Sequence, residues 1–169
     1  MRRDPESAAE PTDAFQDRMP HNHCFGCGPN NPQGLRLKSR WSAENLSVAR
    51  FTPRPWHSAG PEHFVNGGIL ATLIDCHCVC TAAAAAYRDA GREIGSAPGL
   101  HYATARLEVE YLRPTPLTTE LELSARIVAT TERTYVLSCV LAACGKTTAR
   151  ADVEAIRVPE SWVLAPRPL

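Results

Sequence analysis

The longest apolar stretch of the chain covers residues 69–86 and holds no charged side chain except Asp75. Alanine and leucine are strong helix formers, and Asn66, just before the stretch, is a preferred N-cap residue. Gly91 stands where a left-handed C-terminal cap would fall. The pattern predicts one helix of about 24 residues, roughly 36 Å long. Because this helix is apolar on nearly all sides, the rest of the protein must surround it.

Alternation of apolar and polar residues predicts six strands around the helix. Two precede it, at residues 35–41 and 46–51, and four follow it, at 104–112, 120–128, 135–144 and 148–158. Short connections at 131–133 and 145–146 are typical of neighbouring antiparallel strands. Two strands, one helix and then a four-stranded antiparallel meander predict an α+β fold, in which a curved sheet wraps around a single central helix.

One domain, residues 21–158, is expected for a chain of this length. Residues 1–20 are polar and without period, which predicts a flexible N-terminal arm, although Phe15 and Met19 could dock on the body. Residues 159–169 contain three prolines and predict an irregular C-terminal tail.

Composition narrows the class of protein. The helix contains Asp75, His77 and Thr81 and is mostly alanine, so we do not expect it to span a membrane. Eighteen basic and eighteen acidic residues cancel, and without a basic block nucleic acid is not an expected partner. The N-terminus lacks the apolar run of a secretory signal. Seven cysteines without such a signal predict thiols or metal ligands rather than a disulfide framework, and a cytoplasmic protein.

Three segments resemble the hotdog-fold acyl-CoA thioesterases of the PaaI and 4-hydroxybenzoyl-CoA thioesterase type. Residues 65–75 (VNGGILATLID) are similar to the family pattern of His-Gly-Gly, six residues and an acid. Residues 104–114 (TARLEVEYLRP) look like the family strand ending in Tyr-Leu-Arg-Pro, and residues 24–35 (CFGCGPNNPQGL) resemble the N-terminal segment of some members. The likeness covers about residues 22–158 and implies a hotdog fold, thioester hydrolysis and no cofactor.

The positions of Gly67 and Asp75 bear on the mechanism. Gly67 lies at the helix N-terminus, where free amides and the positive end of the dipole favour an oxyanion. Asp75, the only carboxylate inside the helix, is a candidate general base or nucleophile. Eight residues separate them, or about 12 Å along one helix, so both cannot reach one carbonyl. The hypothesis therefore requires a homodimer with shared sites, as the resemblance also implies, alone or as a dimer of dimers.

By resemblance, Gly67 corresponds to the amide that polarises the carbonyl, Asp75 to the catalytic acid and Thr104 to a hydroxyl that positions water. Asn66 replaces the family histidine and, as an N-cap, is expected to preserve the fold. Asn66 and Gly68 are also expected to contact the substrate.

Some members carry an Asn or Gln at the positions held here by Gly60 and Pro61. His57, Ser58 or His63 are the candidate replacements, and His57 and His63 are included among the expected substrate-binding residues.

The expected substrate is an acyl-CoA or acyl-carrier-protein thioester. Two alternatives remain open from the sequence. One is a hotdog protein that binds an acyl or aromatic ligand without hydrolysing it. The other is a hotdog dehydratase or hydratase, which would need a histidine–acid pair.

Cys24 and Cys27, with His21 and His23 nearby, have the spacing of a zinc knuckle. A second ligand pair at ordinary spacing is not evident, because Cys76, His77, Cys78 and Cys80 crowd one helix on different faces. We therefore expect no metal and interpret the segment as a turn that covers one end of the barrel; a zinc site at Cys24 and Cys27 is the open alternative.

Overall fold

The computed structural model describes residues 14–19 and 21–164. Residues 1–13 and 20 of the expected flexible arm, and residues 165–169 of the expected irregular tail, lie outside this range. The elements are η1 Phe15–Arg18, β1 Lys38–Ala43, β2 Leu46–Phe51, η2 Pro55–His57, α1 Gly67–Asp89, β3 His101–Tyr111, β4 Leu121–Thr130, β5 Thr134–Ala143, β6 Lys146–Val158 and α2 Ser161–Leu164.

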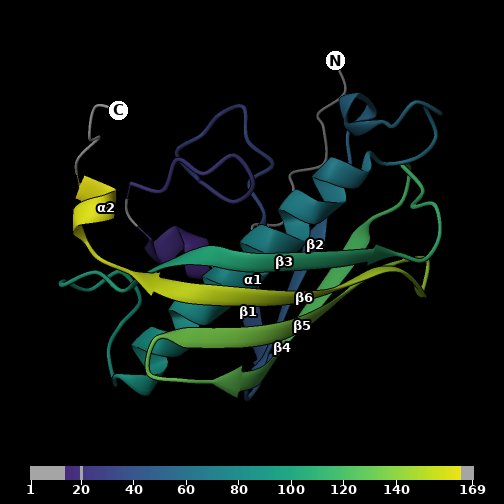
Figure 1. The fold of residues 1–169 in the computed structure, drawn as a ribbon. Coiled ribbons are helices and arrows are strands. Elements are labelled where there is room, and N and C mark those ends of the chain that lie inside the picture. The colour runs from purple at the N-terminus through teal and green to yellow at the C-terminus, as the bar shows by residue number, and fades with distance from the viewer. Residues whose placement is uncertain (1–13, 20, 165–169) are drawn as a thin grey trace.

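The predicted α+β architecture is confirmed. The six strands form one antiparallel sheet that curves around α1, with α1 lying across the strands on one face (Figure 1). Strand β2 has the predicted bounds, while the other strands shift at their ends by up to three residues. These patterns are local and strong, since one side of each strand must face the helix.

The predicted four-stranded meander is wrong in one respect. The order in the sheet is β1-β2-β4-β5-β6-β3, so β3 pairs with β6 and β4 pairs with β2. The connection from β3 to β4 covers residues 112–120 and contains two prolines, which is too long and too stiff for a tight hairpin. As a result β3 lies at one edge of the sheet.

The ends of α1 are set by the predicted caps. Asn66 Oδ1 accepts a hydrogen bond of 2.8 Å from the Gly68 amide. At the other end Gly91 adopts a positive φ of 64°, and the Arg92 amide donates to the Tyr87 carbonyl over 2.8 Å. By length and composition the helix could cross a membrane, but 72% of its most apolar 18-residue window is buried inside the structure. This burial is that of a core helix.

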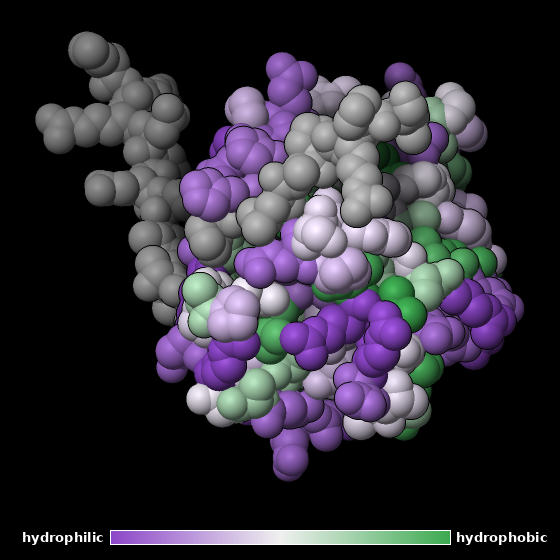
Figure 2. Space-filling view, turned by 60° about the vertical axis from the view of Figure 1, so that its left-hand side comes forward, coloured by the Kyte–Doolittle hydropathy of each residue, from purple (hydrophilic) through white to green (hydrophobic). Residues whose placement is uncertain are grey.

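The core lies between α1 and the concave face of the sheet. The alanines at 82–86 are buried, and small side chains there allow the strands to pass close to the helix axis. Large residues fill the rest of the layer, among them Leu73, Ile74, Leu123, Leu137 and Leu141, each at most 2% exposed. On the face shown in Figure 2, hydrophobic residues appear as patches between hydrophilic ones.

The described part of the N-terminal segment packs on this core. Phe15 is buried, and its ring centroid lies 5.1 Å from that of Trp41 on β1. Gln16, also buried, accepts a hydrogen bond of 2.8 Å from the Ser39 amide through Oε1 and donates to Ser39 Oγ over 3.0 Å. Met19 is partly buried against the same core, so docking through both residues named for it is observed.

Candidate active site

Asp75 and Thr104 meet where β3 passes α1. The Thr104 hydroxyl donates a hydrogen bond to Asp75 Oδ1. Asp75 is half-buried, and burial raises the pKa of its carboxyl, partly opposed by the Thr104 hydrogen bond and reinforced by nearby Cys27. A carboxylate that is poorly solvated is a stronger base than one in water. The structure thus brings together two of the predicted catalytic residues.

Asp75 belongs to the open stripe of α1. Gly68, Thr72, Asp75 and Val79 are three or four positions apart and therefore share one helix face, and each is exposed or half-buried. Strand β3, which flanks this stripe, is at the edge of the sheet and is mostly exposed along its length. A ligand or a second protein chain can approach the pair from this side.

The first turn of α1 leaves one amide available. Within it, the Gly68 amide is bonded to Asn66 Oδ1, and the amides of Ile69 and Leu70 both donate to the Asn66 carbonyl over 3.1 and 3.2 Å. The Gly67 amide is at the first helical position, where the helix itself offers no acceptor, and no acceptor for it occurs among the hydrogen bonds of residues 14–19 and 21–164. This amide is suited to a carbonyl oxygen of a substrate.

Tyr111, a residue to which the sequence assigned no role, packs against Gly67. Its hydroxyl donates to the Gly67 carbonyl over 2.7 Å, and a Cβ on Gly67 would lie 3.4 Å from the ring. Its side chain is 52% exposed and covers the start of the helix. The Tyr-Leu-Arg-Pro motif was the available signal, but only the fold shows that its tyrosine reaches the Gly-Gly pair.

His57 and His63 lie in the loop that leads to α1. His57 Nδ1 accepts a hydrogen bond of 3.0 Å from the Arg54 amide, and its ring stacks on Phe51. Burial, followed by the positive charge of Arg54, lowers the pKa of His57. His63 is exposed, with its ring 4.2 Å from that of Phe64. No hydrogen bond joins either histidine to Asp75 in the described residues, so their contact with substrate stays a prediction.

His77 lies on another side of the helix and is fully buried. Its Nδ1 is 2.9 Å from Ser39 Oγ and its Nε2 is 3.3 Å from Ser47 Oγ. Ser47 Oγ also lies 2.6 Å from Thr81 Oγ1. Burial lowers the pKa of His77 to about 4, so the imidazole is neutral at pH 7. The imidazole of His77 is thus part of a buried hydrogen-bond network that joins β1 and β2 to α1.

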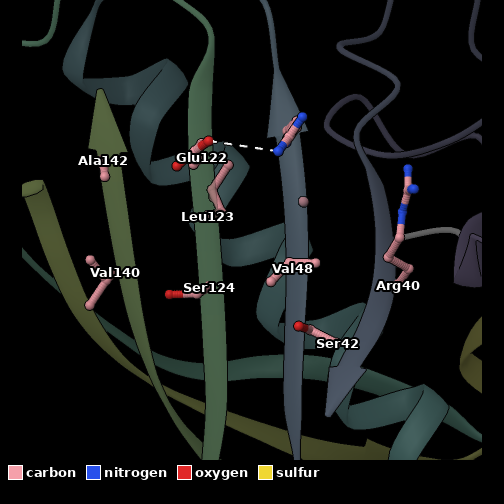
Figure 3. Close-up of a pocket in the computed structure, with 10 residues that line it drawn as sticks. Arg40, Ser42, Val48, Glu122, Leu123, Ser124, Val140 and Ala142 are labelled. Atoms are coloured by element: carbon pink, nitrogen blue, oxygen red, sulfur yellow. Dashed lines mark ion pairs between the residues drawn. The ribbon is translucent and has the colours of Figure 1, made fainter. Parts of the chain in front are cut away.

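A hollow of about 550 Å³ lies on the outer face of the sheet, over β1, β2, β4 and β5 (Figure 3). Its labelled side chains include Arg40, Val48, Glu122 and Val140, and Arg50 forms an ion pair with Glu122 over 3.9 Å. These strands separate it from α1. None of the residues that line it is a predicted catalytic or substrate-binding residue. The hollow is therefore a separate feature of the surface.

A family model described as the thioesterase superfamily matches residues 62–149, which include α1, Asp75 and Thr104. The chain belongs to the thioesterase superfamily. A thioesterase superfamily protein from Shewanella loihica PV-4 is 34% identical, with a TM-score of 0.62, over 82% of this chain and 96% of that one. None of the curated proteins matches.

Two further solved structures share the fold at lower identity. The E. coli PaaI protein from the phenylacetic acid degradation operon is 18% identical over 74% of this chain and 81% of its own, with a TM-score of 0.60. A phenylacetic acid degradation-related protein from Ralstonia eutropha JMP134 is 19% identical over 72% and 85%, with a TM-score of 0.58. The curved sheet around α1 is thus the hotdog fold of this superfamily.

Proposed function

We propose that this member of the superfamily is an acyl-CoA or acyl-carrier-protein thioesterase that acts in the cytoplasm as a homodimer, or as a dimer of dimers, without a cofactor. The observation that carries the proposal is the Asp75–Thr104 pair on the open stripe of α1. A carboxylate with a raised pKa, held by one hydroxyl and reachable from outside, suits a general base or a nucleophile.

Two routes of hydrolysis start from this pair. In the first, Asp75 removes a proton from a water that Thr104 helps to position, and the water attacks the thioester carbonyl. In the second, Asp75 attacks directly, the thiolate leaves, and water hydrolyses the resulting mixed anhydride. In both routes the Gly67 amide would donate to the oxygen that gains negative charge. Rapid acid quenching during turnover, followed by mass spectrometry of the protein, separates them, since only the anhydride route leaves an acyl group on Asp75.

The geometry supports sharing of the site between two chains. Within one helix the Gly67 amide and Asp75 are about 12 Å apart, by the rise of 1.5 Å per residue. Both groups lie on the side of the molecule formed by the edge strand β3 and the open stripe of α1, where a second chain can approach. An antiparallel second copy on that side would place the Gly67 amide opposite the partner's Asp75.

A binding protein without hydrolytic activity is the second candidate. Asn66, at the family's histidine position, uses its side-chain oxygen to cap the helix, so a polar contact to substrate is replaced by a structural one. A dehydratase or hydratase has less support, because no histidine in the described residues forms a hydrogen bond to Asp75 and His77 is engaged with Ser39 and Ser47.

The first experiment measures thiol release from a panel of aliphatic and aromatic acyl-CoAs. We expect Asp75→Asn to lower turnover by about 10²- to 10⁴-fold, the usual contribution of a general base, while ligand binding persists. Asp152→Asn, which changes an exposed carboxylate on β6, serves as the matched control and should leave turnover unchanged. Tight binding of one thioester without release, in the wild type, would favour the binding protein instead.

A second experiment removes only the Gly67 amide hydrogen. Proline is tolerated at the first helical position, and the extended conformation of Asn66 suits a residue before proline. Gly67→Pro should lower turnover by about 10²- to 10³-fold, as for loss of an oxyanion donor, whereas Gly67→Ala keeps the amide and most of the activity.

Mixing the two inactive proteins tests the shared site. A dimer of one Gly67→Pro chain and one Asp75→Asn chain has one site with both defects and one site with none. Turnover should therefore return after the subunits exchange. A mixture that stays inactive, although mass spectrometry shows mixed dimers, would contradict sharing between two chains.

A further inference from the structure

The loop that contains Cys24 and Cys27 lies directly on α1. A Cβ on Gly26 would overlap Cys76 Sγ and come within 2.9 Å of Thr72 Cγ2, so glycine is required for this close approach. The loop is held in a tight turn by the Gly28 amide, which donates to the Cys24 carbonyl over 2.8 Å. Two segments about 50 residues apart in sequence are thereby brought into side-chain contact.

Four sulfur atoms gather at this contact. The Sγ atoms of Cys24, Cys27 and Cys76 all lie within 4.8 Å of one another, with 3.5 Å between those of Cys24 and Cys76. Cys80 joins the group through Cys27, 3.6 Å away. On α1 the two cysteines are four residues apart and so share one face. Cys76 and Cys80 therefore form a second pair of thiols beside Cys24 and Cys27, which the sequence did not reveal.

The other three cysteines, Cys78, Cys139 and Cys144, lie outside this cluster and serve as a comparison. Cys78 is on the same helix but on a different face, where it is fully buried beside Cys139 of β5. Cys144 is exposed next to Thr119. Isolated or paired thiols of this kind behave as small apolar residues. Among the seven cysteines, a cluster of more than two thiols from two segments is formed by Cys24, Cys27, Cys76 and Cys80.

We propose that Cys24, Cys27, Cys76 and Cys80 bind a structural zinc ion that fastens the N-terminal loop to α1. Four thiolates at about 2.3 Å from zinc, in tetrahedral geometry, are about 3.8 Å from one another. The Cys24–Cys76 and Cys27–Cys80 separations of 3.5 and 3.6 Å are close to this edge length. The Sγ atoms of Cys24, Cys27 and Cys76 already lie within 4.8 Å of one another, while that of Cys80 is farther from at least one of them and would move inward to complete the site. A tetrahedral set of four sulfurs selects zinc over hard cations such as magnesium.

The surroundings fit such an ion. Asn22 Nδ2 lies 3.6 Å from Cys27 Sγ, where it can donate to a thiolate, and Asn22 Oδ1 accepts from the Cys24 amide over 3.0 Å. Hydrogen bonds of this kind orient metal ligands. Cys24 is exposed, which gives the ion access from solvent, while the other three thiols are buried. Since Cys76 follows Asp75, the ion would also fix the helix turn that carries the catalytic acid.

The experiment measures the metal itself, so its outcome is independent of thioester hydrolysis. The full chain, purified under reducing conditions and desalted, is analysed by mass spectrometry for metals. We expect one zinc per chain, and expect cobalt substitution to give the intense thiolate charge-transfer absorption of a tetrahedral site. Absence of metal after refolding with zinc, iron in place of zinc, or disulfides within the cluster would each overturn the proposal.

Two matched pairs of variants locate the site. Cys24→Ser and Cys144→Ser both change an exposed thiol, and Cys80→Ser and Cys78→Ser both change a buried thiol of α1. Zinc should be lost from the first member of each pair and retained in the second. Because Cys24 is exposed, its variant should fold even if a buried change does not. Equal zinc contents within both pairs would refute the assignment.

Discussion

Two polar residues stand two positions apart in the same apolar helix, yet their surroundings differ. His77 is fully buried, and both of its ring nitrogens lie within hydrogen-bonding distance of serine hydroxyls on β1 and β2. Asp75 is half-buried, with the hydroxyl of Thr104 as its partner and one side of the helix open around it. Two positions on a helix turn a side chain by about 200°, so the sheet covers one residue and leaves the other accessible.

The difference separates a structural polar group from a reactive one. A buried imidazole with both nitrogens satisfied stabilises the fold and is closed to substrate. A carboxylate with a raised pKa, few partners and an open approach has the properties of a catalytic group. A polar residue within an apolar helix is therefore not enough to indicate a function. Its hydrogen-bond partners and its accessibility to substrate distinguish a reactive group from a structural one.

The largest expected effect that tests this contrast is the dependence of stability on pH. The pKa of His77 is about 4 in the folded protein and about 6.5 when unfolded, so between these values the unfolded state binds more protons. The contribution of neutral His77 to the free energy of unfolding should be fully present above pH 6.5. It should be lost, by about 3 kcal/mol, as the pH is lowered through 4. Denaturant titrations of the wild type and of His77→Leu, which cannot titrate here, isolate this contribution by difference.

His77→Leu itself should cost about 2 kcal/mol at pH 7, because two buried hydrogen bonds are lost. Turnover per folded molecule should stay near that of the wild type, since the imidazole faces away from Asp75. At pH 4 the order should reverse, with the variant more stable than the wild type. A variant that keeps its stability but loses turnover would show that His77, too, belongs to the active site.

Thr104→Val should lower turnover by about tenfold, since a hydrogen bond to a charged group contributes about 1.5 kcal/mol. The Thr104 hydroxyl lowers the pKa of Asp75, so its removal should also move the acid limb of the pH–rate profile to higher pH. Thr147→Val, a partly exposed threonine on β6, is the control. An unshifted limb would mean that Thr104 does not act on Asp75.

The smallest effect concerns the stability of Asp75→Asn. A folded-state pKa above the unfolded value means that ionisation of Asp75 opposes folding as the pH rises above about 4. The variant should therefore melt slightly higher than the wild type at pH 7, and the gap should close at pH 3. A lower melting temperature at pH 7 would place Asp75 with His77, among the residues that hold the fold together.

Much of the fold could be predicted from the sequence because its signals are local. Asn66 and Gly91 mark the helix ends, and β2 alternates within its own six residues. The pairing of β3 with β6 could not be predicted, since it joins segments separated by two other strands and depends on which edge the long connection reaches.

The candidate site was predictable to a similar extent. Motifs place Gly67, Asp75 and Thr104, and the fold adds that Thr104 touches Asp75. Tyr111 and the pairing of Cys76 with Cys24 were not predictable, because each contact spans more than 40 residues and no periodicity encodes it. The shared helix face of Cys76 and Cys80 follows from their four-residue spacing, but the sequence does not show that the loop with Cys24 and Cys27 packs on that face.

The position of β3 in the sheet also affects how the chain folds as it is synthesised. Strand β3 leaves the ribosome directly after the helix, but β6, with which it pairs, is made only after β4 and β5. Until then the apolar helix lacks part of its cover, and β3 presents an unpaired strand. Such intermediates are slow to close and prone to aggregate. Truncation before β6 should therefore yield insoluble protein rather than a smaller folded domain.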